Sequence, residues 1–189
     1  SVMIEKEPVT IVCSTQGWIK ALKGHGHKPS DIKYKDGDRG QFIIEAQTTD
    51  KLVVFATNGR FYTLGCDKLP SGRVFGEPLR IMVDIPNDAH ICEMLLHQSN
   101  QKLLVASTDG RGFIVSSDDV LAQTKTGKQV LNVSGKVEAA ICRYIEEGDD
   151  HIAIIGKNRK MLVFELSELP EMSKGKGVIL QKFKDGGLS

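Results

Sequence analysis

The segment Leu52-Val53-Val54-Phe55-Ala56-Thr57-Asn58-Gly59-Arg60-Phe61-Tyr62-Thr63-Leu64 decides the fold class of this chain. An apolar run, a small polar turn and a β-branched or aromatic run follow one another in it, which is typical of a β-hairpin. Asn-Gly favours such a turn because both residues tolerate the positive φ values that a two-residue hairpin requires. The first run is apolar without alternation, so we expect this strand to be buried on both faces.

The same pattern occurs four times along the 189 residues. The turns fall at positions 17, 59, 110 and 159, so the repeat has steps of 42, 51 and 49 residues. That period is typical of a propeller blade and not of a helical solenoid. The fourth turn contains Asn158-Arg159 and fits the pattern less well, because arginine tolerates a positive φ poorly. The repeat predicts an all-β fold of about four to five blades, each a small antiparallel sheet.

A third apolar run precedes each of the last three hairpins, at residues 42–44, 91–96 and 139–142. Short polar links join each run to the hairpin that follows, so the pattern predicts three-stranded antiparallel meanders. The run 178–183 looks like the first strand of another meander, which stops at Ser189. Either that blade is completed from elsewhere or the chain has been cut short. We therefore expect one domain over residues 1–189, truncated at its C-terminal end unless another segment completes the blade.

The composition is that of an ordinary globular protein, with 40% hydrophobic and 26% charged residues. We expect no membrane contact, because no apolar stretch approaches the roughly 20 residues that span a bilayer, and no signal peptide precedes the first strand. The four cysteines form no CxxC pair, which predicts buried thiols of a reduced, cytoplasmic protein. The net charge of +1 means that any attraction to nucleic acid must come from a local arrangement of cations.

Both ends of the chain resemble a known family, the C-terminal domain of the A subunit of bacterial topoisomerase IV. Residues 7–10 (Glu-Pro-Val-Thr) and 17–25 (Gly-Trp-Ile-Lys-Ala-Leu-Lys-Gly-His) are similar to its first blade, and residues 174–189 to a late blade. The related gyrase A domain carries an early Gln-Arg-Arg-Gly-Gly-Lys-Gly box. This chain lacks that box, and its nearest echo is Lys174-Gly175-Lys176-Gly177. The difference favours the topoisomerase IV branch, with the gyrase A wrapping domain as the alternative.

The resemblance implies a β-pinwheel, a propeller-like ring whose hairpins are exchanged between neighbouring blades. It implies a non-catalytic domain that binds and bends duplex DNA on a basic outer rim, while the catalytic tyrosine of the type IIA topoisomerase lies outside this chain. It also implies three partners: duplex DNA, the N-terminal region of the same polypeptide, and the B subunit of topoisomerase IV in an A2B2 heterotetramer. We expect no cofactor, and a location in the bacterial cytoplasm at the nucleoid.

DNA wrapping requires cations spaced along a curved surface to neutralise phosphates, and it does not require base readout. One set of candidates follows the turns at nearly matching positions, namely Lys20, Arg60, Arg111 and Lys160. Further cations lie in the links between blades. Glycines alternate with Lys174 and Lys176, which would allow the backbone to approach a phosphate closely. Residues 157–184 are the most basic stretch, with seven Lys or Arg against three Glu. The DNA-binding candidates are Lys20, Lys23, Arg60, Arg73, Arg111, Lys128, Lys160, Lys174 and Lys176.

Catalytic and metal-binding functions find no support in the sequence. His25-Gly26-His27 has no third or fourth ligand at a usual zinc spacing, and Asp36-Gly37-Asp38 lacks the other ligands of a calcium loop. No phosphate-binding GxxxxGK[ST] loop, dinucleotide-binding GxGxxG or nucleophile-elbow GxSxG occurs. The sequence therefore predicts a binding domain. A protein-interaction propeller stays an alternative, and it would lack a basic rim.

Overall fold

The computed structural model describes residues 3–146, 148–149, 151–155 and 161–179. Within these ranges the chain forms strands and short 3-10 turns without an α-helix, and none of its helical segments could cross a membrane. The all-β prediction is therefore confirmed. The strands are β1 Pro8–Ser14, β2 Trp18–Lys23, β3 Gly40–Gln47, β4 Lys51–Ala56, β5 Arg60–Gly65, β6 Glu77–Pro78, β7 Ile91–Leu96, β8 Lys102–Ser107, β9 Arg111–Ser116, β10 Lys128–Gln129, β11 Ala139–Ile145, β12 His151–Ile155, β13 Met161–Glu165 and β14 Val178–Ile179. The 3-10 turns are η1 Pro29–Asp31, η2 Cys66–Lys68, η3 Leu79–Ile81, η4 Ser117–Val120 and η5 Leu166–Glu168.

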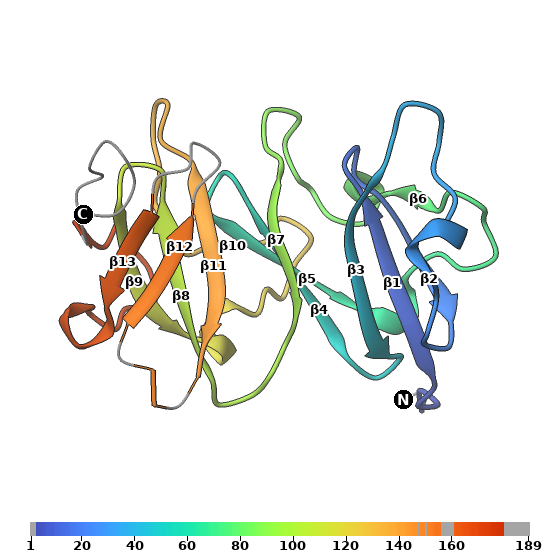
Figure 1. Ribbon diagram of the computed structural model, residues 1–189, viewed down its shortest axis with the longest axis horizontal. Helices are drawn as coiled ribbons and strands as arrows, with labels where there is room; N and C mark the ends of the chain where they lie inside the picture. The colour runs from blue at the N-terminus through green and yellow to red at the C-terminus, as the bar shows by residue number, and fades with distance from the viewer. Residues whose placement is uncertain (1–2, 147, 150, 156–160, 180–189) are drawn as a thin grey trace.

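The strands form four antiparallel sheets, which we call blades 1 to 4 (Figure 1). Blade 1 has the strand order β3-β1-β2-β6, blade 2 the order β7-β4-β5-β10, and blade 3 the order β11-β8-β9-β14. Blade 4 contains β12 and β13. Each blade is built around one of the four repeated hairpins, so the blade repeat read from the sequence is confirmed.

Three of the hairpin turns have the same geometry. Gly17, Gly59 and Gly110 have φ of +83°, +79° and +80°, and each N–H donates to the carbonyl three residues earlier. Three residues connect the strands in each case, a loop in which glycine alone takes the left-handed conformation. Our expectation of two-residue turns with positive φ at both positions was wrong, because Asn58 and Asp109 do not have positive φ. The fourth turn, Asn158-Arg159, lies outside the described residues.

The third strand of each blade does not pair as the sequence suggested. β3 pairs with β1, β7 with β4, and β11 with β8, so each run joins the hairpin before it and not the one that follows. The predicted meanders were therefore wrong in their pairing. The links 48–50 and 97–101 turn the chain out of one sheet and into the next, and both edges of β4 and β8 are already occupied within their own sheets.

A two-residue strand donated by the following repeat completes each of the first three blades. The link after β5 supplies β6 to blade 1, the link after β9 supplies β10 to blade 2, and the link after β13 supplies β14 to blade 3. The start of the run 178–183 is thus the last strand of blade 3, and our prediction of a new meander there was wrong. The blades are linked by exchanged strands, as the β-pinwheel expectation requires.

A glycine precedes each donated strand and allows it to approach its acceptor. Gly76, Gly127 and Gly177 have φ between +76° and +77°, a conformation that other residues adopt only at a cost. A Cβ at these positions would lie 2.1, 2.6 and 2.1 Å from the carbonyl oxygens of residues 19, 61 and 112, which occupy equivalent places in β2, β5 and β9. We call these three residues the exchange glycines.

The apolar core lies between the blades, and β4 shows how. Leu52, Val54 and Ala56 face the cluster shared with blade 1, while Val53 and Phe55 face the cluster shared with blade 3. The side chains of β8 alternate in the same way. One set faces blade 2, and the other set faces blade 4, where Leu104 packs near Leu169. This arrangement confirms that these strands are buried on both faces, and it explains why their sequences are apolar without alternation.

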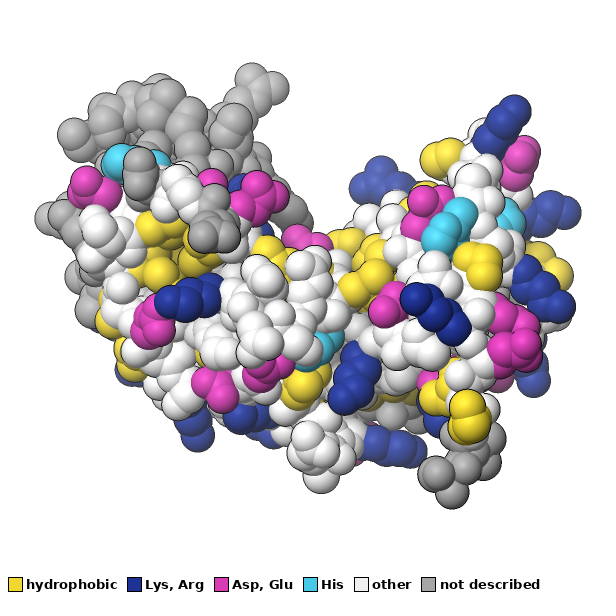
Figure 2. Space-filling view, turned by 90° about the horizontal axis from the view of Figure 1, so that it is seen from below, with side chains coloured by type: hydrophobic (Ala, Val, Ile, Leu, Met, Phe, Trp, Pro, Cys, Tyr) yellow, Lys and Arg dark blue, Asp and Glu magenta, His cyan; other side chains and the backbone are white. Residues whose placement is uncertain are grey.

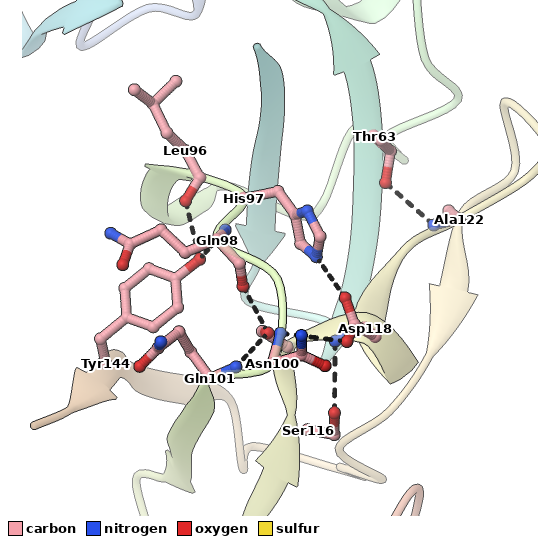
Figure 3. A network of polar contacts seen from close by, with 11 residues as sticks. Thr63, Leu96, His97, Gln98, Asn100, Gln101, Ser116, Asp118, Ala122 and Tyr144 are labelled. Atoms are coloured by element: carbon pink, nitrogen blue, oxygen red, sulfur yellow. Dashed lines mark hydrogen bonds and ion pairs between the residues drawn. The ribbon is translucent and has the colours of Figure 1, made fainter. Parts of the chain in front are cut away.

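A polar network fixes the junction between blades 2 and 3 (Figure 3). The Tyr144 hydroxyl on β11 donates to the carbonyl oxygen of Leu96 at 2.7 Å and accepts from the N–H of Gln98 at 2.9 Å. The ring of His97 lies 3.0 Å from Oδ1 of Asp118, which follows β9. Directional bonds therefore add to apolar packing in setting the position of blade 3 against blade 2.

The described blades form a crescent (Figure 2). β7 packs against β11 and, less closely, against β3, and β7 and β11 lie at the front in Figure 1. The donated strands have no comparable contact with one another. Blade edges that contact one another must lie on the inside of the crescent, so β3, β7 and β11 lie there. The donated strands form the opposite edges of the blades and therefore lie on the outside of the crescent. We call residues 73–78, 125–129 and 174–179 the convex border.

Candidate nucleic-acid interface

The convex border carries exposed cations at related positions. Each of its three segments has a lysine or arginine within three residues of its exchange glycine, and all of these side chains are exposed. Because the exchange glycines occupy the same place in successive blades, the cations recur blade by blade along the border. In Figure 2 several dark-blue side chains project from the outer edge of the crescent. The convex-border cations are Arg73, Lys125, Lys128, Lys174 and Lys176.

Most of these cations are available to a ligand. Arg73 pairs with Glu77 at 3.3 Å, but its side chain is 70% exposed, and such surface pairs contribute little. Lys128 donates to the carbonyl oxygen of Asp119 at 2.5 Å and keeps further donors. Lys174 and Lys176 form no ion pair within the described part of the chain. A phosphate could therefore approach each of the three segments.

Lys20 does not belong to this surface. The residue is only 5% exposed, and its ammonium group donates to the carbonyl oxygens of Lys33 at 2.9 Å and Val74 at 2.6 Å. Desolvation lowers the pKa of this lysine. Its true counterparts in the repeat are Tyr62 and Phe113, both buried, so the apparent match with the arginines was two residues out of register. Lys20 fastens the loop over the outer face of blade 1 and is removed from the candidate interface.

Arg60 and Arg111 occupy equivalent positions, each directly after a turn glycine, but their surroundings differ. The guanidinium of Arg60 donates to the carbonyl oxygens of Thr126 and Gly127 and to the side chain of Gln129, all on the segment that donates β10. Within the described part of the chain, the guanidinium of Arg111 has one charged partner, Asp109, 3.5 Å away, and it lines a cavity of about 220 Å³. Arg60 therefore binds the protein itself, whereas Arg111 faces an open cavity.

Two further candidates complete the sequence-based set. Lys23 lies exposed at the end of β2, away from the donated strands, and its carbonyl oxygen lies 2.7 Å from Nε2 of His27. Lys160 lies outside the described residues. The structure thus brings Arg73, Lys128, Lys174 and Lys176 to one border, and it separates Lys20 and Lys23 from them. Within the described ranges no three His, Cys, Asp or Glu side chains gather as a metal site.

Sequence reasoning missed the signal that organises this border. The exchange glycines recur at 76, 127 and 177, steps of 51 and 50 residues, and each has a cation within three residues. The links have the sequence pattern of loops, because a two-residue strand is too short to show a periodicity. A search for glycines at the blade period within the links would have found them.

The exchanged strands, the blade repeat and the crescent define a β-pinwheel of the propeller type. A family model described as the DNA gyrase C-terminal domain, β-propeller, matches residues 101–141 and 150–188. The C-terminal domain of Escherichia coli ParC superposes with a TM-score of 0.80 at 35% identity, over 90% of this chain and 70% of that one.

Sequence relatives point to one branch of this family. The chain is 50% identical over 185 residues to the A subunit of DNA topoisomerase 4 from Rickettsia felis, covering 98% of this chain and 25% of that protein. It is 35% identical to the Escherichia coli counterpart over 93% of this chain and 23% of that protein. The chain thus spans about a quarter of these relatives. It belongs to the family of C-terminal domains of the bacterial topoisomerase IV A subunit.

Proposed function

We propose that this domain binds the sugar–phosphate backbone of duplex DNA along its convex border and bends the duplex around the crescent. The observation that carries the proposal is the recurrence of exposed cations within three residues of the exchange glycines in three successive segments. A row of charges on a curved surface favours a curved polyanion, since each phosphate neutralised releases counterions. Family membership supports the same role.

The proposed interaction is independent of base sequence. The convex-border cations are lysines and one arginine on short strands and loops, and no α-helix is present in the described residues to enter a major groove. Contacts to phosphates position a duplex without reading it. The net charge of +1 does not oppose this role, because the three segments of the convex border contain five cations and one acidic residue, Glu77.

The domain would act as an accessory part of a type IIA topoisomerase and catalyse no reaction itself. Its relatives are proteins about four times longer than the chain, so a catalytic tyrosine would lie elsewhere in the full-length polypeptide. The N-terminal region of the same polypeptide and the topoisomerase IV B subunit are the proposed protein partners, in the bacterial cytoplasm. No cofactor is proposed for the domain.

A salt series on a random-sequence duplex tests this function. If the five convex-border cations each contact a phosphate, log affinity should fall with log salt concentration with a slope of about −4.5. Replacing Lys174 and Lys176 by Ala should reduce the slope by about two, because two contacts are lost. The matched control is Arg143→Ala, which removes an exposed cation from β11, the strand at the opposite edge of blade 3. This variant should leave the slope unchanged. A flat salt response would favour a protein-interaction propeller instead.

A further inference from the structure

The two hairpin arginines stand in the same register against a donated strand. Arg60 pairs with Gln129 of β10, and Arg111 pairs with Ile179 of β14. In a repeat protein, equivalent positions are expected to make equivalent contacts, yet these two arginine side chains do not. The difference lies in what the donated segment offers to the guanidinium.

In blade 2 the donated segment itself satisfies the arginine. Nε of Arg60 donates to the carbonyl oxygen of Thr126 at 2.9 Å, and Nη2 donates to that of Gly127 at 3.2 Å. Nη1 lies 3.3 Å from Oε1 of Gln129. These bonds use donors from all three nitrogens and hold the guanidinium against the donated segment. A phosphate would have to displace them.

In blade 3 the same position opens onto a cavity of about 220 Å³. Arg111 and Lys176 bring two positive charges to its wall, and Asn132 and Ser134 add polar side chains that make no hydrogen bond within the described part of the chain. Pairing between the segments around Leu131 and Gly175 holds the two sides together. The only carboxylate in the lining, among the described residues, is Asp109, 3.5 Å from Nε of Arg111.

We propose that this cavity binds one phosphate group, for which Arg111 exchanges its partner Asp109. The proposal rests on the proposed function and identifies the phosphate as one of the duplex backbone. A guanidinium, an ammonium and neutral amide and hydroxyl donors are the groups that bind phosphate in proteins. The ion pair between Arg111 and Asp109 is long, and both side chains are about 40% exposed. Such a pair contributes little, so a phosphate oxygen that accepts two contacts can take the place of Asp109.

Asp109 then weakens the binding of the ligand. It orients Arg111 when the cavity is free, and it repels the phosphate that enters. The equivalent residue of the second hairpin is Asn58, whose Oδ1 accepts from the N–H of Arg60 at 3.0 Å. An asparagine therefore fits this turn without strain. The crescent would hold the duplex more firmly at blade 3 than at blade 2.

Four variants of the chain test this proposal on a random-sequence 40-bp duplex. Arg111→Ala and Lys176→Ala should each weaken binding by about tenfold, the effect of one lost charge-assisted contact. Asp109→Asn should strengthen binding by about three- to tenfold, and Arg60→Ala should change it by less than about twofold, since repulsion is removed in the first case and no phosphate contact is lost in the second. Circular dichroism at the assay temperature establishes that each variant is folded. If Arg60→Ala does not fold, the opposite signs expected for Asp109→Asn and Arg111→Ala still decide the question.

A second arm uses inorganic phosphate, followed by the chemical shift of the Asn132 side-chain amide. Competition between inorganic phosphate and the duplex, stronger for Asp109→Asn than for wild type, supports the proposal. Equal loss of duplex affinity in Arg111→Ala and Arg60→Ala, or no gain in Asp109→Asn, overturns it. If the variants differ toward inorganic phosphate but not toward the duplex, the site serves free phosphate and the assignment to the DNA backbone is overturned. Failure of the wild type to bind any duplex would instead overturn the proposed function.

Discussion

Replacing the exchange glycine Gly76 by alanine should weaken the attachment of blade 2 to blade 1. The new Cβ would lie 2.1 Å from the carbonyl oxygen of Ile19 and 2.9 Å from Cβ of Lys20, both in β2. These are main-chain and stem atoms of a buried strand, which cannot move aside as the end of a flexible side chain can. The donated strand β6 would have to shift away from β2, to which it is paired through Glu77.

The size of the effect follows from two separable costs. A non-glycine residue at φ of +77° costs about 1–2 kcal/mol. Overpacking against a rigid neighbour adds about 1–3 kcal/mol, for a total of about 2–5 kcal/mol. Gly72 provides a matched control four residues away, because it has the same φ of +77° and no atom within 4 Å of its Cβ position. Gly72→Ala should show the conformational cost alone.

Urea unfolding followed by circular dichroism measures both variants under identical conditions. With a denaturant slope of about 2 kcal/mol per molar, the midpoint of Gly76→Ala should fall by about 1–2.5 M, and that of Gly72→Ala by about 0.5–1 M. Equal midpoints for the two variants would refute the reasoning, since the close approach of β6 to β2 would then contribute nothing to stability.

Three further outcomes are expected. Tyr144→Phe should lower the free energy of unfolding by about 1–2 kcal/mol, since it removes the bond to Leu96 and leaves a carbonyl unpaired; no loss in urea unfolding would contradict this. Burial raises the pKa of the Cys13 and Cys66 thiols to about 12, so iodoacetamide at about pH 8 should modify them only after unfolding. Rapid modification of the folded protein, detected by mass spectrometry, would contradict this prediction. Desolvation raises the pKa of Glu93, so the folded state binds protons more readily than the unfolded state does. Glu93→Gln should therefore be more stable than wild type at about pH 7, and the difference should shrink as the pH falls through the raised pKa and vanish below the usual glutamate value of about 4.5. A difference that stays constant with pH in urea unfolding would argue against this.

The sequence predicts the fold class because the features that specify it are local. Doubly buried strands such as Leu52–Ala56 are continuous apolar runs, and each described turn glycine has the left-handed φ that its hairpin needs. Strand pairing is not local. β3 lies three residues from β4 in the chain but pairs with β1, and nothing in either strand's own pattern separates these two choices.

The candidate site was predicted in part for the same reason. Arg73, Lys128, Lys174 and Lys176 are exposed on the convex border, yet only the exchange of strands between repeats shows that they share one surface. Spacing alone misplaced Lys20, because a shift of two residues keeps a side chain on the same face of a strand and hides the error. Burial distinguishes it from the arginines, and burial of a lysine is not visible in its sequence neighbourhood.

Photo-crosslinking tests the central claim, that duplex DNA lies on the convex border, most directly. The photo-reactive residue p-benzoylphenylalanine is placed in turn at Lys128 on β10 and at Arg143 on β11, two exposed positions on opposite edges of the blades. Each protein is irradiated with a labelled 40-bp duplex at low salt. We expect strong crosslinking from position 128 and little from position 143. Equal crosslinking, or crosslinking from position 143 alone, would contradict the account.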